Sequence, residues 1–297
     1  MRTGERISTQ KCREYTNAIA TQYAIINLIP YPERKTFEVY NCSHVLTLIV
    51  GGTHAREGEF PHQALLGYRL PEKPMEYVFA CGGSLISEWH VLTAAHCFRD
   101  LDPEVVVLGE HDKSVKSYKE WEIGIDRIRR HPLYPRNQPY FDIALIRLEQ
   151  GVSPSQLIRP ACLWTSEDRP TKKFVASGFG RTDHFREQLS DVLMKVDLDE
   201  FPATTCSTQY QSKKQLRHGL DESHLCVGSV GTGKDTCLGD SGGPLQLLTN
   251  QTTCTYHLVG ITSLGQLCGT EKAYGVYTKV SYYLDWIEDN VWGANAL

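Results

Sequence analysis

The chain has 297 residues and a formal net charge of -4, from 31 basic and 35 acidic side chains. Its hydrophobic share of 41% is enough to bury a large core, and β-barrel proteins of this length often form one main domain. The two charge signs are mixed along the sequence, which excludes the basic surface of a nucleic-acid or anionic-membrane binder. No stretch approaches the roughly 20 apolar residues of a membrane helix, so no membrane span is predicted.

The N-terminal part of the chain differs in character from the rest. The KCREY sequence at 11–15 begins a short helical stretch, and a polar segment with prolines continues to Cys42. Residues 1–10 contain no apolar run that could form the core of a signal peptide. We therefore expect residues 1–48 to be a propiece and residues 49–297 to form the main domain.

From Ile49 onward the chain is organised into short β-rich runs separated by turn residues. The clearest runs are 63–68, 91–93, 105–109, 143–148, 174–178, 258–263 and 275–280. Many short strands with glycine and proline between them favour antiparallel barrels. The last segment is the exception, because an apolar stripe at helical spacing within 282–291 predicts a helix packed on the body.

Ten dispersed cysteines indicate an oxidising compartment. An even number without clustered metal-binding spacings favours a disulfide framework over a zinc site. The glycosylation sequons at Asn41 and Asn250 are compatible with that environment. The sequence thus predicts a secreted, extracellular protein.

Three local motifs carry the chemistry: LTAAHC around His96, FDIAL around Asp142, and DTCLGDSGGP around Ser241. Amide hydrolysis requires a nucleophile, a base that takes its proton, a group that orients the base, and donors for the oxyanion. Singly, such a histidine is most often structural, such an aspartate solvated and such a serine part of a turn. The presence of all three motifs in the order His, Asp, Ser makes three unrelated structural roles improbable and favours a catalytic triad.

These motifs resemble the chymotrypsin family of serine proteases, and the resemblance covers Ile49 to about Trp292. It implies an all-β fold of two antiparallel six-stranded Greek-key barrels, with the active site in the cleft between them and a C-terminal helix. His96 is expected to be the general base, Asp142 its orienting carboxylate and Ser241 the nucleophile. The backbone N–H groups of Gly239 and Ser241 are expected to form the oxyanion hole.

The same resemblance implies specificity for arginine or lysine. Asp235 matches the carboxylate at the base of the specificity pocket, where it pairs with a basic substrate side chain. The expected pocket walls are Ser263, Gly265 and Gly275. Two positions depart from trypsin: Leu264 replaces a tryptophan, and Tyr274 replaces a proline, as in relatives that bind sodium.

The LIVGG sequence resembles the activation site of this family. Cleavage between Leu48 and Ile49 is expected to free an α-amino group that pairs with Asp240 and orders the pocket and the oxyanion loop. Most relatives have arginine or lysine before the cut. Because Leu48 stands there, we expect an activating protease that prefers an apolar residue, and no autoactivation.

The comparison with the family also implies a disulfide pattern. The expected pairs are Cys81–Cys97, Cys206–Cys226 and Cys237–Cys268, with Cys42–Cys162 joining the propiece to the main domain. Cys12–Cys254 is left by elimination, since sequence alone does not fix connectivity.

The runs KCREY, PACLW, VDLDEFP and YLDWIE most resemble arthropod clip-domain proteases of the snake type. Such relatives act in extracellular cascades for Toll and dorsoventral signalling or for melanisation and innate immunity. The implied partners are a downstream zymogen as substrate, an upstream activating protease and a serpin-type inhibitor. A clip domain has six cysteines, and only Cys12 and Cys42 precede Ile49, so we do not expect that domain here.

Glu110 and Glu120 flank a loop as in family members that hold a structural calcium ion. The alternative is that both carboxylates are simply solvated, and no cofactor is required for catalysis. Two other functions remain open: a non-catalytic adaptor on a protease fold, which the intact triad disfavours, and a digestive trypsin, which Leu48 and the retained propiece disfavour.

Overall fold

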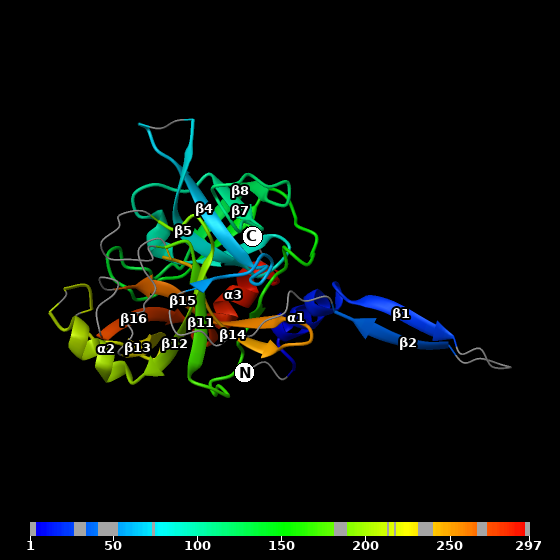
Figure 1. The fold of residues 1–297 in the computed structure, drawn as a ribbon. Helices are drawn as coiled ribbons and strands as arrows, with labels where there is room; N and C mark the ends of the chain where they lie inside the picture. Colours follow the sequence, from blue (N-terminus) through cyan, green and yellow to red (C-terminus); the bar gives the residue numbers. More distant parts are fainter. Residues whose placement is uncertain are drawn as a thin grey trace.

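The structure is a computed structural model that describes residues 4–26, 34–40, 53–72, 75–180, 189–212, 214–216, 218–230, 240–265 and 272–294. Two β-barrels lie against each other and a short N-terminal segment attaches to them (Figure 1). The all-β class with a C-terminal helix is confirmed.

The first barrel is closed, in the order β4-β5-β6-β9-β8-β7. Its strands are β4 (Gln63–Arg69), β5 (Tyr77–Leu85), β6 (His90–Thr93), β7 (Val105–Leu108), β8 (Trp121–Arg130) and β9 (Ala144–Leu148). All four residues of β7 are buried, as expected for an apolar strand whose two faces are both covered.

The second barrel is closed by the pairing of β15 with β16. Its strands are β11 (Lys173–Gly178), β12 (Met194–Phe201), β13 (His224–Val230), β14 (Pro244–Asn250), β15 (Thr255–Leu264) and β16 (Lys272–Lys279). Two short strands join the same sheet, namely β3 (Thr53–His54) beside β12 and β10 (Cys162–Leu163) beside β15.

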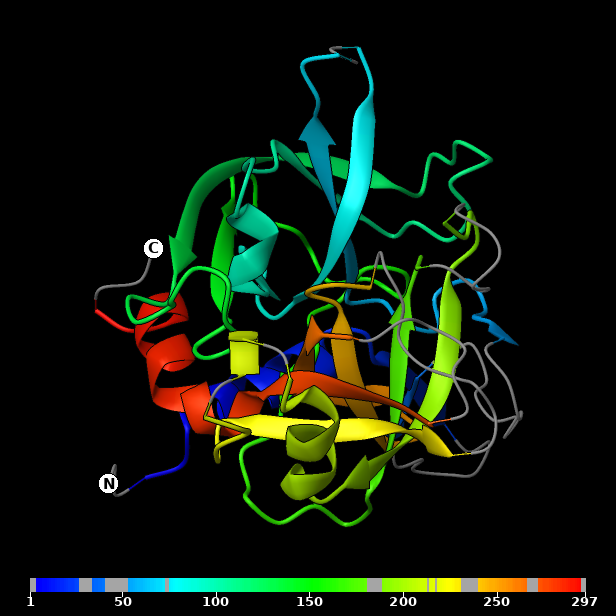
Figure 2. The same cartoon turned by 90° about the vertical axis from the view of Figure 1, so that its left-hand side faces the viewer.

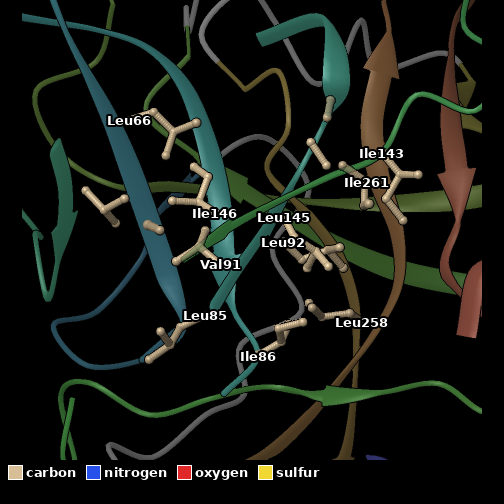
Figure 3. Close-up of a cluster of buried hydrophobic side chains, with 14 of the residues drawn as sticks. Leu66, Leu85, Ile86, Val91, Leu92, Ile143, Leu145, Ile146, Leu258 and Ile261 are labelled. Atoms are coloured by element: carbon tan, nitrogen blue, oxygen red, sulfur yellow. The ribbon is translucent and has the colours of Figure 1, made fainter. Parts of the chain in front are cut away.

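The hydrophobic core continues from one barrel to the other. Figure 3 shows side chains of the first barrel, such as Leu66 and Ile146, together with Leu258 and Ile261 of β15 from the second barrel. The shared core fixes the relative position of the barrels, because close-packed interiors resist sliding.

Short helices lie between and after the strands. They are η1 (Ala95–Phe98), α2 (Ala203–Tyr210), η2 (Lys214–Leu216), η3 (Val280–Tyr283) and α3 (Leu284–Val291). The predicted apolar stripe of α3 does pack on the body: Ile287 and Val291 are buried in the core and Trp286 lies against it. Figure 2 shows α3 in red against the first barrel.

The N-terminal segment forms α1 (Ile7–Asn17) followed by a hairpin of β1 (Thr21–Ile26) and β2 (Arg34–Val39). The helix lies against β10, whereas the hairpin projects away from the barrels (Figure 1). The short helix was predicted, although its start at Ile7 is earlier than the KCREY motif. The hairpin was not predicted.

The disulfide that anchors this segment differs from the expected one. Cys12 bonds to Cys162, with 5.0 Å between their Cα atoms, so the predicted Cys42–Cys162 and Cys12–Cys254 pairs are wrong. The reason is tertiary: α1 docks directly on β10 and places Cys12 over Cys162. Cys254 is also disulfide-bonded.

Two expected disulfides are present in the barrels. Cys81–Cys97 fastens the end of η1 to β5, and Cys206–Cys226 fastens α2 to β13. Cys237 and Cys268 lie outside the described residues, so their expected pair stays a prediction.

Candidate active site

The pairing of β6 with β9 brings the predicted base and its orienting carboxylate together. Thr93 at the end of β6 lies opposite Ala144 at the start of β9, so the residues just beyond these ends are neighbours. His96 follows β6 in η1 and Asp142 precedes β9. The Nδ1 atom of His96 lies 2.8 Å from Oδ2 of Asp142, and the His96 backbone N–H donates to Oδ1 at 2.8 Å.

Asp142 is held from the second barrel as well. The Ser263 hydroxyl donates a short hydrogen bond to Oδ2, and the Thr278 hydroxyl donates to the Asp142 backbone carbonyl at 2.9 Å. The Asp142 side chain is only 2% exposed, whereas that of His96 is 16% exposed. A buried carboxylate surrounded by donors fixes the orientation of the histidine, whose remaining nitrogen is free for proton transfer to a substrate group.

Ser263 therefore has a role that the sequence reasoning missed. It was expected on the wall of the specificity pocket, and its hydroxyl contacts the catalytic carboxylate. The register of the antiparallel pairing between β15 and β16 could not be predicted from the sequence. This register also places Thr278 next to Asp142, where its hydroxyl donates to the backbone carbonyl.

Ser241 lies beside the His96 loop through its backbone. Its carbonyl accepts a hydrogen bond from the Gly82 N–H at 2.8 Å and lies 3.8 Å from the Cys97 sulfur. Among the described residues its hydroxyl makes no hydrogen bond to His96. Such bonds are often long before substrate binds.

The turn after Ser241 requires glycine. Gly242 has φ +76°, and a Cβ atom there would lie 2.2 Å from the Thr93 hydroxyl oxygen. Any larger residue would push Ser241 away from the His96 loop, since this backbone conformation is also strained for residues with a side chain.

Asp240 occupies a space lined by glycines. Its Oδ1 accepts the Gly180 N–H at 2.9 Å, and a Cβ atom on Gly178 would lie 2.0 Å from the same oxygen. The close approach of the backbone means that the carboxylate is held next to the predicted oxyanion loop.

Several predicted site residues lie outside the described part of the chain, namely Leu48, Ile49, Asp235 and Gly239. Of the predicted pocket walls, Gly265 directly follows β15 and Gly275 lies buried in β16. The pairing of Leu264 with Val276 holds these two strand segments beside each other.

The two glutamates considered for calcium are close enough to interact. Burial and the negative charge of Glu120 both raise the pKa of Glu110, against hydrogen bonds from the backbone of His111 and Asp112. Oε1 of Glu110 is buried without a hydrogen-bond partner among the described residues, while Oε1 of Glu120 accepts the Ser117 N–H at 2.7 Å. An orphaned carboxylate oxygen beside a second carboxylate fits a hard cation with oxygen ligands.

Other candidate metal groups in the described residues do not fit a metal. The two clusters of possible ligands are Cys12, Cys162 and His257, and Cys81, His96 and Cys97. In both clusters the sulfur atoms form a disulfide and so cannot act as thiolate ligands.

A buried Asp–His pair, with a serine held beside it between two closed barrels, defines the class of two-barrel serine endopeptidases. Comparison with known proteins agrees, since residues 49–287 match the Trypsin family model. The chain belongs to the trypsin family.

Several similar proteins come from insects. The chain is 41% identical over 288 residues to "Serine protease snk" of Drosophila melanogaster, covering 96% of this chain and 65% of that protein. It is 35% identical to "Serine protease Hayan" of the same species, covering 89% of the chain and 43% of that protein. It is 36% identical to "CLIP domain-containing serine protease B4" of Anopheles gambiae, covering 85% of the chain and 73% of that protein. The chain thus spans less than two thirds of the first two relatives. None of its described helices is long and apolar enough to cross a membrane.

Proposed function

We propose that this chain is the protease part of a secreted zymogen that cleaves peptide bonds after arginine or lysine. The observation that supports this most is the His96–Asp142 pair, with the buried carboxylate fixed from both barrels and Ser241 beside it. An adaptor without activity would have no need of this arrangement.

In the proposed mechanism, His96 removes the proton from the Ser241 hydroxyl as that oxygen attacks the substrate carbonyl carbon. The negative charge that develops on the carbonyl oxygen is stabilised by the N–H groups of Gly239 and Ser241. Asp142 stabilises the imidazolium, which then gives its proton to the leaving amine. Water then attacks the acyl group on Ser241 by the same steps in reverse order, with His96 again taking the proton, and the acyl group is released.

The proposed specificity rests on Asp235 and on a pocket that we expect between the end of β15 and the first half of β16. A buried carboxylate pairs with a basic side chain through charge-assisted hydrogen bonds, which discriminate strongly against neutral side chains. Gly265 and Gly275 leave room for the long chain of arginine or lysine.

Activation is proposed to occur by cleavage between Leu48 and Ile49. The new α-ammonium group would pair with Asp240, whose carboxylate the Gly178 and Gly180 backbone accommodates. Because Leu48 is apolar, the activating protease is expected to differ in specificity from this enzyme.

The cascade role is carried over from the relatives. Besides the proteins named above, "Melanization protease 1" of Drosophila melanogaster is 36% identical over 271 residues. We propose that this protein acts in an immune or Toll-type extracellular cascade, with a downstream zymogen as substrate and a serpin-type inhibitor.

The deciding experiment uses a variant in which a specific protease recognition sequence precedes Ile49. Cleavage of fluorogenic peptides with Arg, Lys, Phe or Leu before the scissile bond is measured before and after the cut. Hydrolysis of only the Arg and Lys peptides, only after the cut, and its loss in Ser241→Ala is the expected result. A folded and cut protein that hydrolyses none of them would favour the adaptor.

We also propose that Glu110 and Glu120 hold a structural calcium ion. Calcium would neutralise two carboxylates that otherwise repel each other, and so stabilise their loop. The expected result is a rise in melting temperature with millimolar Ca²⁺ that Glu110→Gln abolishes and Glu57→Gln, an exposed glutamate bound to Lys119, does not. An equal response of both variants would contradict the site.

A further inference from the structure

A cavity of about 390 Å³ lies on the first barrel beside the loop that carries the catalytic histidine. Ala95 and Phe98, which flank His96 in η1, form one wall. The other walls carry Arg99, Arg130, His131, Tyr134 and Arg136. None of these polar residues has a role in the proposed catalytic mechanism.

The wall contains two buried polar atoms without a hydrogen-bond partner among the described residues. They are Nε of Arg99 and the hydroxyl oxygen of Tyr134. Burial and the negative charge of Asp142 raise the pKa of Tyr134, and the close approach of the Arg99 side chain and of the Asn137 backbone N–H lowers it, which places these groups near one another. Buried donors without acceptors are costly, so an acceptor bound here would be stabilised.

The positive charge of the cavity is only partly neutralised. Arg130 bonds to Asp102 at 2.7 Å through one amino nitrogen and lies over the Phe98 ring. Arg136 lies 3.8 Å from Asp100 and donates to the Arg99 carbonyl. Both aspartates are more than half exposed, and the Arg99 side chain has no ion pair in the described part of the chain. Each guanidinium therefore retains free N–H donors.

The surroundings favour a polypeptide over a polysaccharide as the partner. Leu133 is 63% exposed next to the lining residue Tyr134, and Leu101 is 40% exposed between the two rim aspartates. A sulfated polysaccharide offers anions but little apolar surface, whereas an acidic peptide segment offers both. Through Ala95 and Phe98 the cavity lies directly beside His96.

We infer that this cavity binds the carboxylate of an acidic residue near the scissile bond of the protein substrate. The inference rests on the proposed endopeptidase function and adds to it a second specificity site for a charge opposite to that recognised by Asp235. Binding of the carboxylate would satisfy Arg99 and Tyr134 and would replace the solvent around Arg130 and Arg136.

The experiment compares paired fluorogenic peptides of eight residues that have arginine before the scissile bond. In each pair, one position carries either glutamate or glutamine, and the pairs cover all remaining positions. Gln and Glu have nearly the same shape, so the ratio of kcat/KM within a pair isolates the charge. We expect a preference for glutamate of about tenfold at one or two adjacent positions, which falls as salt is added.

Three variants locate the effect in the cavity. Arg99→Gln, Arg130→Gln and Arg136→Gln should each reduce the Glu-to-Gln ratio, and the two exposed residues keep the test valid if Arg99→Gln does not fold. The matched control is Arg147→Gln, because Arg147 also pairs with one aspartate at 2.8 Å on the same barrel, but away from the cavity. Its ratio should equal that of the unchanged protein.

Two outcomes would overturn the inference: ratios near one at every position, or a preference that persists in all three variants. A third result would also overturn the inference. If the Glu-to-Gln ratios are near one and heparin competes with substrate in a way that the same variants abolish, the cavity would be assigned to a sulfated glycan. The affinity of the same peptides for the Ser241→Ala variant, measured by fluorescence anisotropy, gives a Glu-to-Gln ratio that does not depend on catalysis. A failure of the proposed peptidase activity therefore stays distinguishable from a failure of the cavity.

Discussion

Two neighbouring parts of the N-terminal segment attach to the molecule in opposite ways. Helix α1 is covalently bound through Cys12 and also inserts polar side chains into the body. Ser8 is 3% exposed and donates to Glu288 at 2.6 Å, and Tyr15 donates to Glu88 at 3.0 Å. The β1–β2 hairpin projects into solvent, with Tyr23 50% exposed.

Intrinsic stability does not decide which part of the N-terminal segment is anchored. An isolated helix of 11 residues is marginal in water, and α1 has no side-chain cap at its N-terminus. A two-stranded hairpin alone is equally marginal. Helix α1 is stable because buried partners and a disulfide hold it, and so it is structurally part of the protease.

The largest effect is expected from removing the disulfide. Cys12→Ala combined with Cys162→Ala opens a loop with a sequence separation of 150 residues. The unfolded chain gains freedom, so the free energy of unfolding should fall by about 3 to 4 kcal/mol. Urea unfolding followed by tryptophan fluorescence measures the change. An unaltered urea midpoint would show that α1 is not anchored in this way.

A smaller loss is expected at Glu288. Its side chain is fully buried and accepts hydrogen bonds from Ser8 and from Arg6 Nη1 at 3.0 Å. Glu288→Gln removes the charge that Arg6 pairs with, and should lower the free energy of unfolding by about 2 kcal/mol. The exposed pair of Glu57 and Lys119 provides the control, since Glu57→Gln should change it by less than about 0.5 kcal/mol. Equal losses in the two variants would contradict a buried anchor.

The attachment of α1 is expected to weaken in mild acid. Burial lowers the pKa of His257 to about 4, and its Nε2 lies 3.8 Å from the Cys12 sulfur. Between about pH 4 and 6.5 the unfolded chain binds a proton that the folded chain does not, so stability falls as pH falls through this range. The free energy of unfolding is lower at pH 5 than at pH 7, and His257→Gln should reduce this difference by about 1 to 2 kcal/mol. Urea unfolding at both pH values tests this, and the exposed His54→Gln should keep the full loss.

The smallest effect distinguishes the two tyrosines of the segment. Tyr15→Phe deletes a hydrogen bond to Glu88 at a site only 3% exposed and should cost about 1 kcal/mol. Tyr23→Phe keeps the ring of a side chain that is 50% exposed on the projecting hairpin, and because exposed substitutions have small effects it should change the free energy of unfolding by less than about 0.3 kcal/mol. A larger loss for Tyr23→Phe would mean that the hairpin contributes to the folded body.

Local patterns in the sequence predicted several of the barrel strands, the C-terminal helix and the catalytic pair. Runs such as 63–68 and 105–109 form β4 and β7, because short apolar stretches between turn residues have few other stable structures. His96 and Asp142 could be named in advance, since each sits in a local motif whose chemistry is readable without the fold. The exposed β8, half of whose residues are polar, was not among the predicted runs, and neither were β5, β12, β13 and β14.

Contacts between distant residues depend on the fold and could not be predicted from the sequence. Strand register placed Ser263 on the Asp142 carboxylate and Thr278 on its backbone carbonyl, and the docking of α1 on β10 replaced Cys42 by Cys12 as the partner of Cys162. The charged cavity beside His96 likewise combines side chains from two separate loops and a strand. Local sequence patterns report local preferences, whereas these contacts depend on long-range packing that leaves no periodic signal in the chain.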